Sequence, residues 1–105
     1  MNGLPFRPEC LGGWRSLIED CHREMLAVDA DYSVVQVKEK FGSLRYYYST
    51  SYEPNDPRAD ELWGIARKYE ELSSTVCESC GSHGATNERH EGWWRTRCEA
   101  CRRTK

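Results

Sequence analysis

The sequence Cys77-Glu78-Ser79-Cys80 is followed by a second pair, Cys98-Glu99-Ala100-Cys101, with seventeen residues between the inner cysteines. Zinc prefers four soft or borderline ligands in a tetrahedron, and a two-residue gap lets one tight turn present two thiolates to the same ion. Gly81 follows the first pair, where the chain often needs a positive φ to leave such a turn. The intervening segment is long enough to run out, turn and return as a short hairpin. The four cysteines therefore predict one structural zinc ion in a C-terminal ribbon over residues 77–105.

Two histidines offer alternative ligands in the same region. His83 lies three residues after Cys80, and His90 lies near the expected hairpin turn; either could replace a cysteine, or both could be surface residues. A catalytic zinc keeps one coordination position open for water, whereas four thiolates leave none. The chain also has no Gly-rich phosphate loop and no His-Glu-x-x-His sequence. We therefore expect a metal that holds structure, and no enzymatic activity.

The remaining two cysteines fit other roles. Cys21 continues an apolar helical stripe, so we interpret it as a small core residue. Cys10 lies in an irregular N-terminal segment, which leaves it as a free thiol or a partner in an adventitious disulfide.

Chain length, apolar content and cysteine pattern together predict a small cytoplasmic protein. At 105 residues it is one domain, or one domain with a small module, and a metal is physically useful at this size. No stretch approaches the ~20 apolar residues of a membrane span. The first eight residues lack the apolar core of a secretory signal, and paired Cys-x-x-Cys motifs favour a reducing compartment. We expect a cytoplasmic protein with no membrane partner.

The pattern upstream of the cysteines predicts an α+β domain over residues 1–76, packed with the ribbon as one unit. A first helix is predicted over residues 14–27 by apolar residues at helical spacing, namely Trp14, Leu17, Ile18, Cys21 and Met25. Asp56 before Pro57 is a helix start, because Asp caps orphan N–H groups and Pro suits the first helical position. The apolar spacing that follows predicts a second helix over residues 57–72.

Between these helices, residues 33–49 predict an antiparallel hairpin. β-branched and aromatic residues flank a charged, Gly-containing link. Alternation places Leu44, Tyr46 and Tyr48 on one face and Tyr47 on the other, with Val35 and Val37 as partners of the apolar face. Tyr47 beside Arg45 is also a candidate stacking platform, although simple alternation explains the tyrosine run.

Candidate partner-binding residues lie just before the second cysteine pair. On a strand, Trp93 and Trp94 face opposite sides, so we expect one to pack inside and the other to point outward beside Arg95 and Arg97; the other reading is that both are core. The alternative to a protein partner is nucleic acid, bound by an exposed Trp with the arginines at positions 95, 97, 102 and 103.

Charge favours a protein partner. Residues 77–105 carry six Lys/Arg against four Asp/Glu, and four thiolates with one Zn²⁺ bring the ribbon to about zero. A nucleic-acid binder usually has a strong basic surplus on one face.

Three segments together resemble a family of small phage and prophage proteins. They are Gly13-Trp14, the stretch from Val37 to Tyr47 (VKEKFGSLRYY), and Gly92-Trp93 before the last Cys-x-x-Cys. The resemblance covers about residues 12–101 and implies a phage-encoded protein in the cytoplasm of a bacterium. It implies no settled activity. Small phage proteins often bind host proteins, including components of bacterial defence, as anti-CRISPR proteins do. We therefore expect a non-enzymatic zinc protein that binds a host protein.

Overall fold

The computed structural model describes residues 5–103, except for the side chains of His90 and Arg103. In chain order the elements are a 3-10 turn η1 (Gly12–Trp14), α1 (Arg15–Val28), β1 (Ser33–Lys40), β2 (Ser43–Ser49), α2 (Pro57–Leu72), a 3-10 turn η2 (Ser73–Thr75), β3 (Thr86–His90), β4 (Trp93–Arg97) and α3 (Glu99–Arg103). The predicted α+β order of helix, hairpin, helix and C-terminal hairpin is confirmed.

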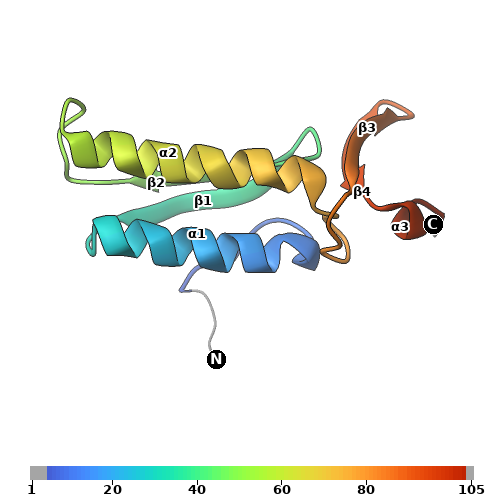
Figure 1. Cartoon of the computed structure of the whole chain (residues 1–105), viewed down its shortest axis with the longest axis horizontal. Coiled ribbons are helices and arrows are strands. Elements are labelled where there is room, and N and C mark those ends of the chain that lie inside the picture. Colours follow the sequence, from blue (N-terminus) through green and yellow to red (C-terminus); the bar gives the residue numbers. More distant parts are fainter. Residues whose placement is uncertain (1–4, 104–105) are drawn as a thin grey trace.

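The elements form an elongated molecule of 45 × 31 × 20 Å. Helices α1 and α2 lie side by side and run antiparallel, with the β1–β2 hairpin against them (Figure 1). The β3–β4 hairpin and α3 extend from one end, where α1 begins, α2 ends and the β1–β2 turn lies (Figure 1). We call residues 5–76 the body and residues 77–103 the ribbon.

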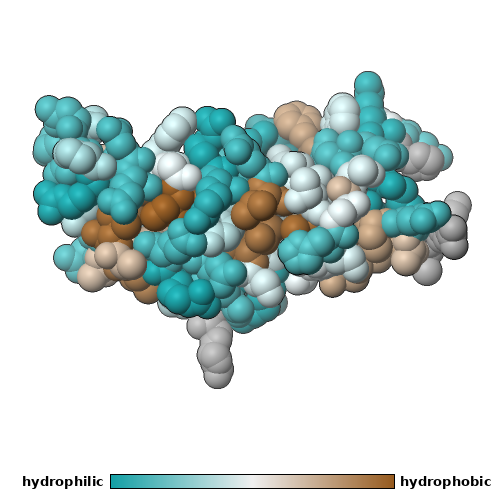
Figure 2. All heavy atoms as spheres, viewed as in Figure 1, coloured by the Kyte–Doolittle hydropathy of each residue, from teal (hydrophilic) through white to brown (hydrophobic). Residues whose placement is uncertain are grey.

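Helix α1 and the 3-10 turn η1 before it contribute one apolar stripe to the core. Trp14, Ile18, Cys21 and Met25 are buried, as their helical spacing predicted, whereas Leu17 of the same stripe is half-buried. The interpretation of Cys21 as a core residue is thus confirmed. On the face that Figure 2 displays, hydrophobic residues gather along the seam between α1 and α2, and hydrophilic residues cover much of the remainder. Each such buried side chain stabilises the fold by roughly 1.5–3 kcal/mol.

The β1–β2 hairpin has the predicted tyrosine pattern but not the predicted valine pattern. Tyr46 is buried and Tyr48 half-buried, whereas Tyr47 is exposed. The register shifts between Val34 and Gln36, which leaves Val35 as an extra residue that is 67% exposed. The assignment of Val35 to the apolar face is therefore wrong, because a bulge reverses the alternation at that point.

Both edges of this two-stranded hairpin are occupied. The Leu44 N–H donates to Ser73 Oγ and the Tyr46 N–H to Glu70 Oε2, each at 2.9 Å. On the other side the Glu9 N–H donates to the Val37 carbonyl at 2.7 Å. Side chains and a loop thus satisfy backbone groups that a bare edge would expose.

A polar chain runs through the core beside the hairpin. The Tyr32 hydroxyl contacts His22 Nδ1 at 2.5 Å and the Tyr46 hydroxyl at 2.7 Å. Burial raises the pKa of Tyr32 to about 12 and raises that of Tyr46 further. Both hydroxyls therefore stay neutral and paired, as buried polar groups require.

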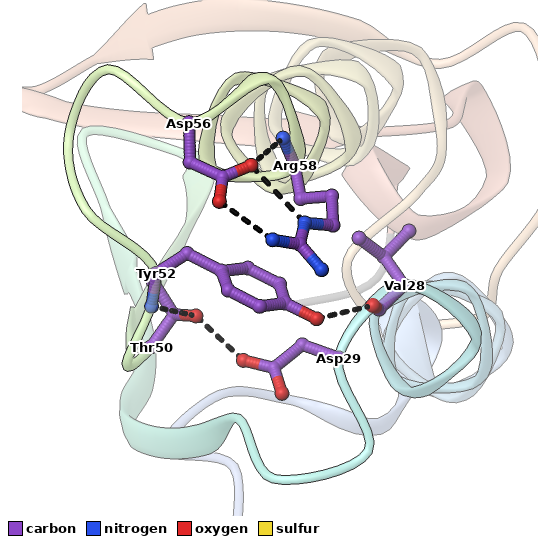
Figure 3. Close-up of polar contacts among 6 residues, drawn as sticks. All are labelled: Val28, Asp29, Thr50, Tyr52, Asp56 and Arg58. Carbon is purple, nitrogen blue, oxygen red and sulfur yellow. Dashed lines mark hydrogen bonds and ion pairs between the residues drawn. The ribbon is translucent and has the colours of Figure 1, made fainter.

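A second polar cluster closes the end of the body that lies away from the ribbon (Figure 3). The Tyr52 hydroxyl donates to the Val28 carbonyl at 3.1 Å, and the Arg58 guanidinium lies 4.2 Å from the centre of the Tyr52 ring. Asp56 accepts from the Arg58 N–H at 2.9 Å, which confirms it as the N-cap of α2. These contacts hold the loop between β2 and α2 against the end of α1.

Candidate metal centre

The first cysteine pair lies on a tight turn at the start of the ribbon. The Gly81 N–H donates to the Cys77 carbonyl at 2.9 Å, and the Cys77 N–H donates to the Ser82 carbonyl at 2.8 Å. Gly81 has φ +84°, the left-handed conformation that the sequence led us to expect there. The turn brings the Cys80 N–H to 3.5 Å from Cys77 Sγ.

The second pair is delivered by the β3–β4 hairpin. Glu91 and Gly92 both have positive φ, 52° and 86°, as the two-residue turn of a tight hairpin requires. Cys98 follows β4 directly and Cys101 lies in α3. The Arg102 N–H donates to the Cys98 carbonyl at 3.1 Å, so this pair also closes a helical turn.

The structure brings the four predicted sulfur ligands together. The sulfur atoms of Cys77, Cys80, Cys98 and Cys101 all lie within 4.8 Å of one another. Cys80 Sγ and Cys98 Sγ are 3.6 Å apart, too far for a disulfide. A tetrahedral Zn²⁺ with bonds of about 2.3 Å would place its sulfurs about 3.8 Å apart. The cluster is thus of a size that could hold a metal ion, and its thiol donors are consistent with zinc.

The structure describes the side chain of only one of the two histidines considered as alternative ligands. His83 is exposed and does not belong to the group of four, although its backbone forms a bridge with Val76. The side chain of His90 lies outside the described residues. Cys10 is half-buried and is a free thiol, and burial raises its pKa to about 11.

The thiols of the cluster do not titrate alike. Burial opposes ionisation of the Cys77 thiol. Backbone N–H groups, among them the Cys80 N–H, donate to the Cys77 sulfur, and together they lower the pKa of Cys77 below its ordinary value. The Ser82 hydroxyl and N–H lower the pKa of Cys80. Contacts with the other three sulfurs raise the pKa of Cys101 to about 12. Four thiolates this close repel one another, and a bound cation would offset that repulsion.

Gly13 holds the first cysteine turn against the body. Its N–H donates to the Glu78 carbonyl at 2.9 Å. A Cβ added at Gly13 would lie 2.2 Å from the Cys77 carbonyl oxygen, so only glycine fits this approach. Next to it, the Trp14 indole N–H donates to the Val76 carbonyl at 2.8 Å.

The β1–β2 turn holds the hairpin of the ribbon in a similar way. Gly42 has φ +78°, and a Cβ added there would lie 2.9 Å from the backbone nitrogen of Arg95. The Thr96 hydroxyl donates to the Gly42 carbonyl at 2.6 Å, and Asn87 donates to the Phe41 carbonyl at 3.3 Å. Gly13 and the β1–β2 turn thus both lie at the junction between body and ribbon.

Glu78 joins the two halves of the ribbon. It is 2% exposed, its N–H donates to the Thr96 carbonyl at 2.9 Å, and its Oε2 accepts from the Thr96 N–H at 2.7 Å. Glu78, Asn87 and Thr96 could not be recognised from the sequence, because a lone polar residue gives no local signal that it is buried or bridges two elements.

An aromatic groove opens where the ribbon meets the β1–β2 turn. Its cavity of about 290 Å³ is lined by Glu39, Lys40, Phe41, Gly92, Trp93 and Trp94. Phe41 is 63% exposed, Trp93 67% and Trp94 39%. The expectation that one tryptophan packs inside is wrong, and so is the reading that both are core. Both lie beside the hairpin turn, where a two-stranded ribbon has too little thickness to bury either ring.

A second cavity, the arginine pocket, lies on the ribbon and has a volume of about 300 Å³. Its lining residues are Glu88, Arg89, Glu91, Trp93, Arg95, Arg97 and Arg102. The predicted contact residues Trp93, Arg95 and Arg97 thus come together. Tyr47 lines a different cavity, formed between β2 and α2 with Trp63 and Arg67. The side chain of Arg103 lies outside the described residues.

Comparison of the chain with protein-family models, with curated proteins and with solved structures gave no match. Among the described residues, no helix is long and apolar enough to cross a membrane.

Proposed function

We propose that this chain is a zinc-clamped, non-catalytic binding protein whose partner is another protein. The observation that carries the proposal is the aromatic groove, around which Phe41, Trp93 and Trp94 are all exposed. Clustered exposed apolar side chains mark interaction sites on soluble proteins, and Trp is enriched among the residues that dominate binding energy. Lys40 and Glu39 at the rim are of opposite charge, as at a polar rim around an apolar centre.

The metal is Zn²⁺, one ion per chain, and its role is structural. Four thiol donors support this assignment, since such a set leaves no coordination position for water or substrate. Binding energy at such a site is folding energy. The purified protein should carry one equivalent of zinc. Substitution by Co²⁺ should produce the thiolate-to-metal absorption of a tetrahedral four-sulfur site, and octahedral Co²⁺ absorption would contradict the ligand set.

The setting we propose is the cytoplasm of a bacterium that carries a phage, with a host protein as the partner. The host protein that we propose is a component of a bacterial defence system. The chain would then act as an inhibitor of that system, as anti-CRISPR proteins do. The support is the resemblance of Gly13-Trp14, the stretch from Val37 to Tyr47, and Gly92-Trp93 to small phage proteins.

An affinity experiment with matched variants tests the groove. The tagged chain, Phe41→Ala and Trp94→Ala are each incubated with bacterial lysate, with Trp63→Ala as control. Trp63 is exposed on α2 and lies beside Arg67, but it does not line the groove. We expect wild type and Trp63→Ala to recover the same partner in stoichiometric amount, and both groove variants to lose it. Recovery of no stoichiometric partner would contradict the proposal, as would retention of the partner by both groove variants.

A further inference from the structure

The arginine pocket concentrates positive charge on a chain that is otherwise acidic. Its lining contains four arginines against Glu88 and Glu91, whereas the whole chain has a formal net charge of −2. A local surplus of this kind attracts anions to one face even when the net charge is unfavourable. The pocket is distinct from the aromatic groove, and Trp93 forms a wall of both.

Strand β4 arranges the pocket as an aromatic plane followed by two guanidinium groups. Trp93, Arg95 and Arg97 alternate along the strand and therefore share one face, at steps of about 6.6 Å. The Arg95 guanidinium lies 5.7 Å from the centre of the Trp93 ring. Trp93 is 67% exposed, so much of its ring remains open to a ligand.

The arginines differ in how firmly the protein holds them. Arg102 donates to the Thr86 carbonyl at 2.9 Å and lies 3.3 Å from Glu88, so it forms a fixed wall. Arg95 is held more loosely, by a long ion pair 3.9 Å from Glu39 and by its contact with the Trp93 ring. The Nε of Arg97 is buried and has no hydrogen-bond partner among the described residues. An unpaired buried donor costs free energy, and an anion that accepts a hydrogen bond from the Arg97 guanidinium would offset part of that cost. Two cationic groups are thus available.

We propose that the arginine pocket binds one or two nucleotides of a single-stranded nucleic acid. A base stacks on Trp93, and Arg95 and Arg97 bind the adjoining phosphates. Unpaired bases stack on aromatic side chains while basic residues follow the backbone, and this combination distinguishes single strands from duplexes. Residues 53–76 carry six Asp/Glu against three Lys/Arg, so the charge of that segment disfavours a second contact there.

Fluorescence anisotropy with labelled eight-nucleotide oligouridine and oligothymidine tests the proposal. Two phosphate contacts predict a slope of about −1.4 in log affinity against log salt. Affinity should therefore fall about sevenfold between 50 and 200 mM salt. A duplex of the same length should bind more weakly, because its bases are not free to stack on the tryptophan.

Point variants assign the binding to the pocket. Trp93→Ala should lower the affinity at least about fivefold through lost stacking. Arg97→Ala should lower it about tenfold and bring the salt slope to about −0.7. Arg95→Ala should act in the same direction, and it keeps the test valid if Arg97→Ala does not fold. Trp63→Ala and Phe41→Ala are the controls and should bind like the wild type, since neither residue lines the pocket. Zinc content and melting temperature should match the wild type throughout.

Several outcomes would overturn the proposal. They are no binding at millimolar protein, affinity that does not depend on salt, equal binding of the duplex, or full affinity in both the tryptophan and the arginine variants. Competition by an acidic peptide as effective as that by the oligonucleotide would assign the pocket to carboxylates of a protein. Because Phe41→Ala affects only the groove and Arg97→Ala only the pocket, failure here leaves the proposed protein partner standing.

Discussion

Replacing Gly13 by alanine should destabilise the protein by about 2–4 kcal/mol, although the change adds one methyl group. The new Cβ would lie 2.2 Å from the Cys77 carbonyl oxygen and 2.4 Å from the Glu78 carbonyl carbon. Ordinary contacts lie at 3.4–4 Å, so the ribbon would have to move by about 1 Å. Overpacking of this kind costs about 1–3 kcal/mol. Movement would also stretch the hydrogen bond from Gly13 to Glu78, worth about 1 kcal/mol.

The adjacent glycine is the matched control. A Cβ at Gly12 would meet nothing within 4 Å, so Gly12→Ala should lie within about 0.5 kcal/mol of the wild type. Urea denaturation followed by tryptophan fluorescence measures both variants, and thermal melting should show a loss of about 10–20 °C for Gly13→Ala. Equal stability of the two variants would refute the close approach of the first cysteine turn to the start of α1.

Three further perturbations test other parts of the structure. Cys98→Ser should lose the bound metal, and a chelator should lower the melting temperature of the wild type but not of this variant. Gly64→Ala, inside α2 with open space around the new Cβ, should raise the free energy of unfolding by about 0.5–1 kcal/mol in urea denaturation. Burial lowers the pKa of His22 in the folded chain. As the pH falls, His22 therefore becomes protonated in the unfolded chain before it does in the folded chain. The folded chain loses stability relative to the unfolded chain below about pH 6.5, the ordinary pKa of histidine. The decline in melting temperature from pH 7 to pH 5 should therefore be smaller in His22→Gln than in the wild type, and an equal decline would contradict this assignment.

Much of the fold could be predicted from sequence because its signals are local. The second helix was predicted over residues 57–72, and α2 spans Pro57–Leu72 with Asp56 as its cap. Helical spacing identified Ile18, Cys21 and Met25 as core residues, and all three are buried. The Cys-x-x-Cys spacing identified the four sulfurs that the structure brings together. Each of these signals, the helical spacing and the two-residue gap inside each cysteine pair, spans only a turn or two of chain.

Two predictions from the alternation of residues along a strand are wrong, because tertiary structure overrides the alternation there. Val35 was assigned to the apolar face, but a bulge turned it outward. Alternation predicts that one of Trp93 and Trp94 is covered, but both are exposed just after the turn between β3 and β4. Alternation predicts which residues share a face of a strand, and it does not predict whether anything packs there.

The sequence by itself determined the order of the two long helices and the two hairpins, the apolar stripe of the first helix and the identity of the clustered thiols. Only the tertiary structure decided how the ribbon is placed and what it exposes. Gly13 and Glu78 are distant in sequence, as are Gly42 and Thr96, yet hydrogen bonds between them set the position of β4. Periodicity reports on neighbours a few residues apart, whereas these approaches depend on the packing of elements that meet only when the whole chain has folded. The same packing places Phe41 beside the two tryptophans and gathers the arginines on one face.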